Sequence, residues 1–358
     1  MTRVNLGNLS SPLDKREKGA SRLSERMVDD SGKIIYANVI KSYPWIVEKG
    51  HKCILSPDSD GLLCGLLMQH LLDWDVCGFY DGKVMLLKHG IQVRECVFLD
   101  MEIFRSFVRS IGQHMLMWKP EKDVRRPEWA NFQNCISPNN MRLFGGSPAQ
   151  KKFSKKYPLA TIHLLLAIIG SQMQIAIKDD AICPLLYTDG TFKNMFNYPE
   201  NVLDWLDFLC ANDVANPLHK VFYNNCYSTN KLMLALRDFF AAIKAIGGTS
   251  RGGDKIVISN SRSRGPENLD QDGSRFKLNG AQVEIANKFL SMLAEQTGWG
   301  YRPEKWAFEN FNVFQFEKGT IKPNGRNYED MLRRKPLSWA MTSGQAIEYT
   351  VEGPDRLA

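Results

Sequence analysis

Two aspartates stand at alternating positions where an apolar segment gives way to a helical pattern. The segment reads "CILSPDSDGLLCGLLMQHLL", from Cys53 to Leu72, and the aspartates are Asp58 and Asp60. Neighbouring carboxylates repel each other unless a cation neutralises them, and hard oxygen ligands suit Mg²⁺ or Mn²⁺. Taken singly, the tetrapeptide "DSDG" is more typical of a turn in which Asp60 caps the following helix.

Two further aspartates end predicted strands. The strand predicted over residues 51–57 leads into the first pair, "ECVFLD" ends at Asp100, and "AICPLLYTD" ends at Asp189. The carboxyl ends of parallel strands meet at one edge of a sheet, where ligands bind. Because independent turns need not all fall at one edge, this pattern favours a metal site. Two ions held there would activate a water and stabilise an in-line displacement at phosphorus.

Alternating strand and helix patterns predict the elements that would position these carboxylates. A helix is expected over 59–74, two strands around the turn Asp81-Gly82, and a helix over 101–112. Further helices are expected near 158–170, 199–211, 229–246 and 281–298. We therefore predict an α/β fold with a doubly wound, mainly parallel sheet.

The chain is expected to divide into three parts. Its 358 residues exceed what one core usually takes. Residues 1–33 are polar and predict a loose arm, and the glycine-rich "GGTSRGGDK" that starts at Gly247 predicts a linker. The expected domains are an α/β domain over 34–246 and a smaller C-terminal α+β domain over 247–358.

Composition narrows the possible partners and the compartment. The net charge of +7 fits a polyanionic partner such as nucleic acid, or a basic protein without one. The eight cysteines include no C-x-x-C pair, so a structural zinc site has no support, and reduced thiols in apolar runs predict a cytoplasmic protein. No apolar stretch reaches membrane-spanning length and the N-terminus has no secretory pattern, so no membrane partner is expected.

The order of these features resembles the DHH phosphoesterase superfamily, which includes RecJ-type exonucleases, oligoribonucleases and inorganic pyrophosphatases. The resemblance covers about residues 50–210: "LSPDSDGLLCGLLM" is similar to the first motif, "CVFLDMEIFR" to the second and "LLYTDGTFKN" to the fourth. The nearest match to the third, Asp-His-His, is "SIGQHMLMW", with Gly112 and Gln113 in place of the family's Asp and first His, followed by His114. The His or Asp that usually precedes the first motif is also missing.

The resemblance implies a site and roles for its residues. Its metal ligands would be Asp58, Asp60, Asp100, His114 and Asp189, with Asp60 and His114 catalytic and Mn²⁺ or Mg²⁺ as cofactor. The smaller C-terminal domain would hold the substrate. From its apolar neighbours alone, His114 fits a core histidine as well as a ligand. His163, on a strongly apolar helix, is interpreted as core packing.

Basic residues supply candidate phosphate contacts, because Lys and Arg pair well with phosphate oxygens. Phe153 lies within the lysine-rich run over 151–156 and Tyr157 directly follows it, so both could stack on bases. A solvated surface is the alternative for each cluster. The candidates are Lys151, Lys152, Lys155, Lys156, Arg251, Arg262 and Arg264.

The expected function is that of a hydrolase: a metal-dependent phosphodiesterase, or nuclease, of DHH type. It would cleave single-stranded nucleic acid or short oligonucleotides with a metal-activated water. The alternative is a catalytically degenerate relative that binds single-stranded nucleic acid or a partner protein. A dinucleotide-binding enzyme is disfavoured, because no G-x-G-x-x-G follows the first strand.

Overall fold

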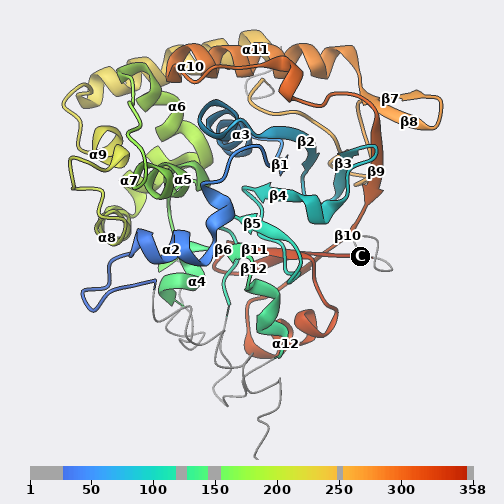
Figure 1. The fold of residues 1–358 in the computed structure, drawn as a ribbon, viewed down its shortest axis with the longest axis horizontal. Coiled ribbons are helices and arrows are strands. Elements are labelled where there is room, and N and C mark those ends of the chain that lie inside the picture. Colours follow the sequence, from blue (N-terminus) through green and yellow to red (C-terminus); the bar gives the residue numbers. More distant parts are fainter. Residues whose placement is uncertain (1–26, 118–126, 144–154, 248–252, 353–358) are drawn as a thin grey trace, which may run out of the picture.

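The computed structural model describes residues 27–117, 127–143, 155–247 and 253–352. Within these ranges it confirms the predicted α/β class and the smaller C-terminal sheet (Figure 1). The large sheet has the strand order β6-β5-β4-β1-β2-β3-β9-β8-β7. Its strands are β1 (Lys52–Leu55), β2 (Asp75–Tyr80), β3 (Val84–Lys88), β4 (Cys96–Leu99), β5 (Arg109–Ile111), β6 (Cys135–Ile136), β7 (Leu269–Asp272), β8 (Arg275–Leu278) and β9 (Phe311–Gln315).

The parallel half of this sheet contains a topological switch point. Strand β1 pairs in parallel with β2 on one side and with β4 on the other. The chain passes from β1 through α3 (Ser59–Leu72) to β2, whereas β4 leads to β5 on the opposite side. Ligands of open α/β sheets bind where neighbouring strands diverge in this way. Asp58 and Asp60 follow β1, and Asp100 follows β4, so the three aspartates lie at this point.

The other half of the sheet is antiparallel and crosses the predicted domain boundary. Strand β3 pairs with β2 and with β9, and β8 joins β9 to β7. Strands β7 to β9 thus extend the large sheet, although they come after residue 247. The smaller sheet has the order β10-β12-β11, with α12 (Gly325–Arg333) packed on it. Its strands are β10 (Glu317–Ile321), β11 (Ser338–Ser343) and β12 (Ala346–Val351).

Helices gather over one face of the large sheet, as Figure 1 shows for α3, α5 and α11. Leu55 and Val97 on that face belong to one apolar core with these helices. On the opposite face, Ile54 packs with Ile103 and Leu337 from segments outside the regular helices. The remaining helices are α2 (Tyr36–Ser42), α4 (Pro138–Leu143), α5 (Thr161–Gly170), α6 (Ile182–Tyr187), α7 (Thr191–Asn197), α8 (Pro199–Phe208), α9 (Pro217–Phe222), α10 (Thr229–Gly247) and α11 (Gly280–Thr297).

Short 3-10 helices join several of these elements. No helix in the described ranges is long and apolar enough to cross a membrane. Part of the predicted N-terminal arm is folded: Met27 is buried, and its carbonyl accepts the Ile35 amide at 2.8 Å. Residues 1–26 lie outside the described ranges. The 3-10 helices are η1 (Pro44–Ile46), η2 (Val93–Glu95), η3 (Pro127–Phe132), η5 (Asp179–Ala181), η6 (Thr188–Gly190) and η7 (Pro303–Lys305).

Two predicted elements are wrong. The expected helix over 101–112 is an irregular segment followed by β5, and its backbone bonds to other elements, with the Phe104 amide donating to the Leu337 carbonyl. The expected strand over 181–189 is helix α6, in which Pro184 lies in the first turn, where no intrahelical N–H is required. A short apolar run fits a buried strand or a buried helix equally well, so periodicity could not separate them.

Candidate metal centre

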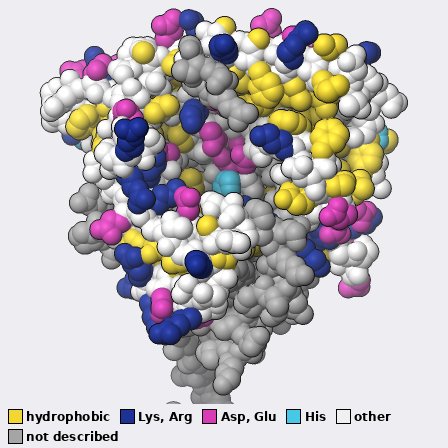
Figure 2. Space-filling view, turned by 180° about the vertical axis from the view of Figure 1, so that it is seen from behind, with side chains coloured by type: hydrophobic (Ala, Val, Ile, Leu, Met, Phe, Trp, Pro, Cys, Tyr) yellow, Lys and Arg dark blue, Asp and Glu magenta, His cyan; other side chains and the backbone are white. Residues whose placement is uncertain are grey.

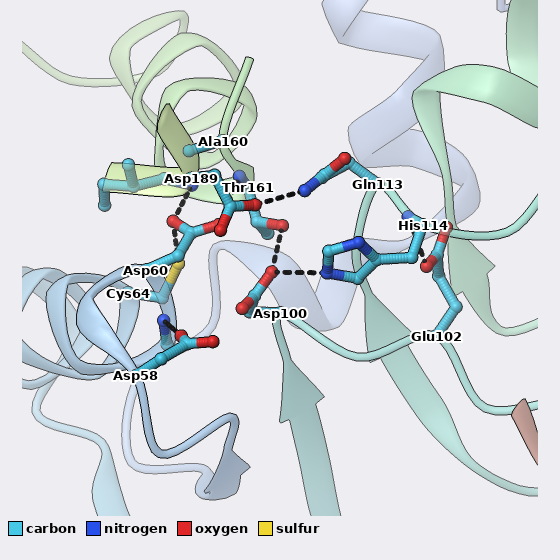
Figure 3. Close-up of polar contacts among 12 residues, drawn as sticks. Asp58, Asp60, Cys64, Asp100, Glu102, Gln113, His114, Ala160, Thr161 and Asp189 are labelled. Atoms are coloured by element: carbon cyan, nitrogen blue, oxygen red, sulfur yellow. Dashed lines mark hydrogen bonds and ion pairs between the residues drawn. The ribbon is translucent and has the colours of Figure 1, made fainter. Parts of the chain in front are cut away.

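Asp100, His114 and Asp189 form a compact group of potential metal ligands. One ligand atom from each side chain lies within 4.8 Å of the other two. Asp100 follows β4, His114 follows β5, and Asp189 lies in the turn η6 between α6 and α7. Figure 3 shows these side chains pointing toward one another from three separate elements. Two carboxylates and one imidazole are a donor set that a divalent cation can use.

Asp100 is held by its backbone and by its neighbours. It is 1% exposed and has a φ of 63°, in the left-handed region that Asp tolerates better than most residues. The Thr161 hydroxyl donates to its Oδ1 at 2.7 Å, and His114 Nε2 lies 3.4 Å from the same oxygen. Asp100 therefore has a fixed orientation toward the group.

His114 is positioned through its backbone by a buried carboxylate. Glu102 is 1% exposed and its Oε2 accepts the amides of His114 at 2.8 Å and Met115 at 3.1 Å. A Cβ on Gly112 would lie 2.9 Å from the same oxygen and 3.0 Å from the Glu102 backbone nitrogen, so a larger residue would force this segment to shift. The His114 side chain is 27% exposed and lies at the site, so it is not a core histidine.

His163 is the buried core histidine that the sequence predicted. It is fully buried, and its Nδ1 accepts the Ala160 amide at 3.1 Å. Burial lowers its pKa to about 3, so the ring is neutral at physiological pH.

Asp189 lies at a helix end, although the sequence predicted the end of a strand. Its φ is 52°, again left-handed, and the Gln113 side-chain amide donates to its Oδ2 (Figure 3). The Gln113 backbone carbonyl in turn accepts a hydrogen bond from the Asn139 side-chain amide at 2.7 Å. Gln113 thus joins Asp189 to the segment that carries His114.

Asp58 and Asp60 lie beside the group and have structural partners. The fully buried Asp60 accepts the amides of Thr161 at 2.7 Å and Ile162 at 3.0 Å, in the first turn of α5. Asp58 caps α3 by accepting the Gly61 amide at 3.2 Å. The predicted cap at Asp60 is therefore wrong: Asp58 caps α3, while Asp60 lies in the first turn of α3 and joins it to α5. Both contribute negative charge next to Asp100.

The carboxylates are strongly coupled. Burial, and then the charge of Asp100, raise the pKa of Asp60 well above its usual range. Burial and the charges of Asp58 and Asp189 do the same to the pKa of Asp100. Asp189 is an exposed residue, but partial desolvation of its carboxyl among its neighbours, followed by the charge of Asp60, raises its pKa to about 7, although His114 acts in the opposite direction. A cation at the group would relieve this repulsion.

Two cavities meet at His114. The larger, of about 550 Å³, lies between the ends of the large-sheet strands and the smaller sheet, and its lining includes Asp58, Glu102 and Lys255. The smaller, of about 320 Å³, includes Asp189 and Lys156. Figure 2 shows acidic side chains and a histidine on the floor of a central hollow, with Lys and Arg side chains around it.

The predicted phosphate contacts have different outcomes. Lys156 lines the smaller cavity, whereas Lys155 is exposed. Arg262 and Arg264 are exposed and line neither cavity, and the Arg264 side chain donates to the Lys318 carbonyl at 2.7 Å. Lys151, Lys152 and Arg251 lie outside the described ranges.

Sequence reasoning missed two residues that organise the centre, Glu102 and Thr161. Thr161 donates its hydroxyl to Asp100 and its amide to Asp60, and so joins the two carboxylates to α5. A hydroxyl residue at the start of an apolar helix was a signal for a helix N-terminus. Nothing in the sequence indicated that the helix would point at the carboxylates.

No family model matches the chain, and no curated protein or solved structure is significantly similar to it. The resemblance to the DHH superfamily therefore remains a prediction from the motifs.

Asp60→Asn should destabilise the protein by about 1–3 kcal/mol, because an amide NH₂ would face one of the two α5 amides. The measurement is the urea midpoint of unfolding in EDTA. Asp58→Asn is the matched control, since Asn caps helices as well as Asp does and should leave the midpoint nearly unchanged. Equal midpoints for the two variants would contradict this role of Asp60.

Gln113→Ala should lower metal-dependent activity about 10–100-fold, the usual effect of losing a residue that orients a ligand. Steady-state rates with Mn²⁺ provide the measurement. The control is Gln133→Ala, because Gln133 is exposed and its side chain bonds only weakly to the Ser106 carbonyl at 3.3 Å. A higher rate in Gln113→Ala would mean that Gln113 competes with the ion for Asp189.

Proposed function

We propose that the protein is a metal-dependent phosphodiesterase of DHH type that cleaves single-stranded nucleic acid or short oligonucleotides. One observation carries the proposal: Asp100, His114 and Asp189 converge at the switch point of an α/β sheet, beside two further carboxylates. The charges of His114 and Lys156 lower the pKa of Asp189, yet burial and repulsion among the carboxylates still raise the pKa values of Asp60 and Asp100.

Asp100, His114 and Asp189 would hold the ion, and Asp58 and Asp60 would add negative charge around it. Mn²⁺ suits this set better than Mg²⁺, because one donor is an imidazole nitrogen and Mg²⁺ prefers oxygen. When bound, the ion would activate water for attack at phosphorus. The protein's own part is to orient the ligands through Glu102, Thr161 and Gln113.

The two cavities support a substrate that extends on both sides of the metal group. Both share Ala340 and Thr342 of strand β11, so the smaller sheet forms one wall of the path. A phosphodiester centred at His114 could place one neighbouring unit in each cavity. Pyrophosphate would leave most of the larger cavity empty, so the two cavities favour an oligonucleotide over pyrophosphate.

The test uses end-labelled single-stranded DNA, RNA, dinucleotides and pyrophosphate, each incubated with Mn²⁺ and wild-type protein or Asp189→Asn. We expect cleavage of at least one single-stranded substrate by the wild type, abolished by EDTA and by the variant. Cleavage that persists in the variant, or no cleavage of any substrate, would overturn the proposal.

One observation favours the alternative of binding without turnover. The Gln113 amide donates to Asp189 Oδ2, an oxygen that the ion would need, and the family motif has a histidine at that position. In that case wild-type protein and Asp189→Asn would bind single-stranded nucleic acid equally, with strong salt dependence and no cleavage.

A further inference from the structure

The smaller cavity contains a lysine that the metal group does not use. Lys156 is half-buried and lines the cavity beside Asp189 and His114. Burial lowers its pKa, and the charges of Glu102, Asp189 and Asp100 act on it in the opposite direction, through space. Within the described ranges, its ammonium makes no ion pair with these carboxylates. A lysine at a cavity wall that forms no ion pair with a described carboxylate has donors left for a ligand.

The backbone around Lys156 is fixed by side chains from two helices. Asn201 and Trp205 of α8 donate to the carbonyls of Lys156 at 2.8 Å and Lys155 at 3.1 Å. Asn194 of α7 donates to the Pro158 carbonyl at 2.6 Å. Lys156 is therefore held at the cavity by rigid elements, while Lys155, its neighbour in the chain, is exposed.

We infer that the smaller cavity is a phosphate-binding subsite in which Lys156 holds a phosphate oxyanion of the substrate next to the metal group. The inference deepens the proposed function and rests on it for the ligand being part of a substrate. The size of the cavity, about 320 Å³, suits a phosphate with an attached nucleoside. Tyr198 in its lining is exposed and offers an aromatic face for such a group, whereas Tyr157 is buried against Trp205.

The test is calorimetric titration of inorganic phosphate and adenosine 5′-monophosphate into wild type, Lys156→Met and Lys155→Met, in EDTA and again in Mn²⁺. Met keeps the unbranched stem of Lys and removes its charge. We expect Lys156→Met to bind both probes about 10-fold more weakly or worse, the loss of a charged hydrogen bond, and Lys155→Met to match the wild type. Equal binding by all three proteins, or no binding by the wild type, would overturn the subsite.

Mn²⁺ titration of the same proteins separates this inference from the proposed function. Removal of a cation beside Asp189 should leave Mn²⁺ affinity unchanged or raise it, while phosphate affinity falls. A loss of phosphate affinity without a loss of Mn²⁺ affinity cannot come from a general loss of folding. Lys156-dependent phosphate binding without any Mn²⁺ binding would support the subsite and contradict the metal centre. Mn²⁺ binding together with phosphate binding that does not depend on Lys156 would support the metal centre and contradict the subsite.

Two sources of the phosphate can be told apart with the dinucleotide adenylyl-adenosine, which has an internal phosphodiester and no terminal phosphate. If Lys156 contacts the scissile phosphate, Lys156→Met should weaken this probe as much as the monophosphate. If Lys156 contacts a terminal phosphate, the dinucleotide should bind all three proteins equally. Both results support the subsite, provided that Lys156→Met weakens the binding of adenosine 5′-monophosphate.

Discussion

Asp189→Asn should lower Mn²⁺-dependent hydrolysis by more than about 100-fold, because loss of a residue that only orients a ligand already costs 10–100-fold. The substitution preserves the surroundings of the site. Asn tolerates the left-handed backbone of residue 189, and its Oδ1 can still accept the Gln113 amide. What is lost is the negative charge that would bind the ion.

The matched control is Asp180→Asn, which makes the same chemical change at an exposed carboxylate in the preceding turn η5. It should retain wild-type rates. Circular dichroism and thermal unfolding in EDTA should show that Asp189→Asn is folded, with a melting temperature at least equal to that of the wild type. An inactive variant that is also unfolded would say nothing of the metal, whereas a folded variant with wild-type rates would exclude Asp189 as a ligand.

The local elements of the fold were predictable where one pattern dominated. Helices α3, α5, α8, α10 and α11 and strands β1 and β4 lie within a few residues of their expected positions, because their periodicity and end signals agree. The helix predicted over 101–112 is wrong because the apolar side chains of this segment are buried by neighbouring segments while its backbone is irregular. No local signal distinguishes that burial from an amphipathic helix.

The candidate site was predictable only in part. Strand-end positions identified Asp58 and Asp100, since β1 and β4 are both parallel and adjacent. Asp189 was selected for a wrong reason, because it ends a helix. The capping of α5 by Asp60 depends on residues 101 positions apart, and contacts at such separation follow from tertiary packing. Sequence patterns carry no information on it.

Metal and pH should act on stability in opposite directions at this centre. Asp60, Asp100 and Asp189 have folded-state pKa values above the unfolded value of 3.8, and that of Asp189 is about 7. A group of this kind holds its proton more tightly in the folded state. Its contribution to stability is therefore complete below pH about 4 and is lost as pH rises toward about 7. In EDTA, the stability of the wild type relative to Asp189→Asn should fall across this range.

The quantity to measure is the difference in stability between wild type and Asp189→Asn, because titration of His163 changes stability with pH in the opposite direction. Its pKa is lowered to about 3 by burial, so it contributes stability that is lost as pH falls below its unfolded value of 6.5. This contribution is common to wild type and variant and cancels in the comparison. A difference that stays constant between pH 4 and 7 would mean that Asp189 is not coupled to the other carboxylates.

Addition of Mn²⁺ should restore the stability that the folded protein loses as the pH rises. A ligand at 100 times its dissociation constant stabilises the folded state by about 2.7 kcal/mol. The ion must also displace protons from its ligands. For each displaced proton, Mn²⁺ affinity rises about tenfold per pH unit as long as the pH is below the pKa of that ligand. The increase in melting temperature on adding Mn²⁺ should therefore be larger at pH 7 than at pH 5, and it should be small in Asp189→Asn at both. Equal increases in wild type and variant would place the ion away from Asp100, His114 and Asp189, since an ion bound elsewhere has no reason to depend on that carboxylate.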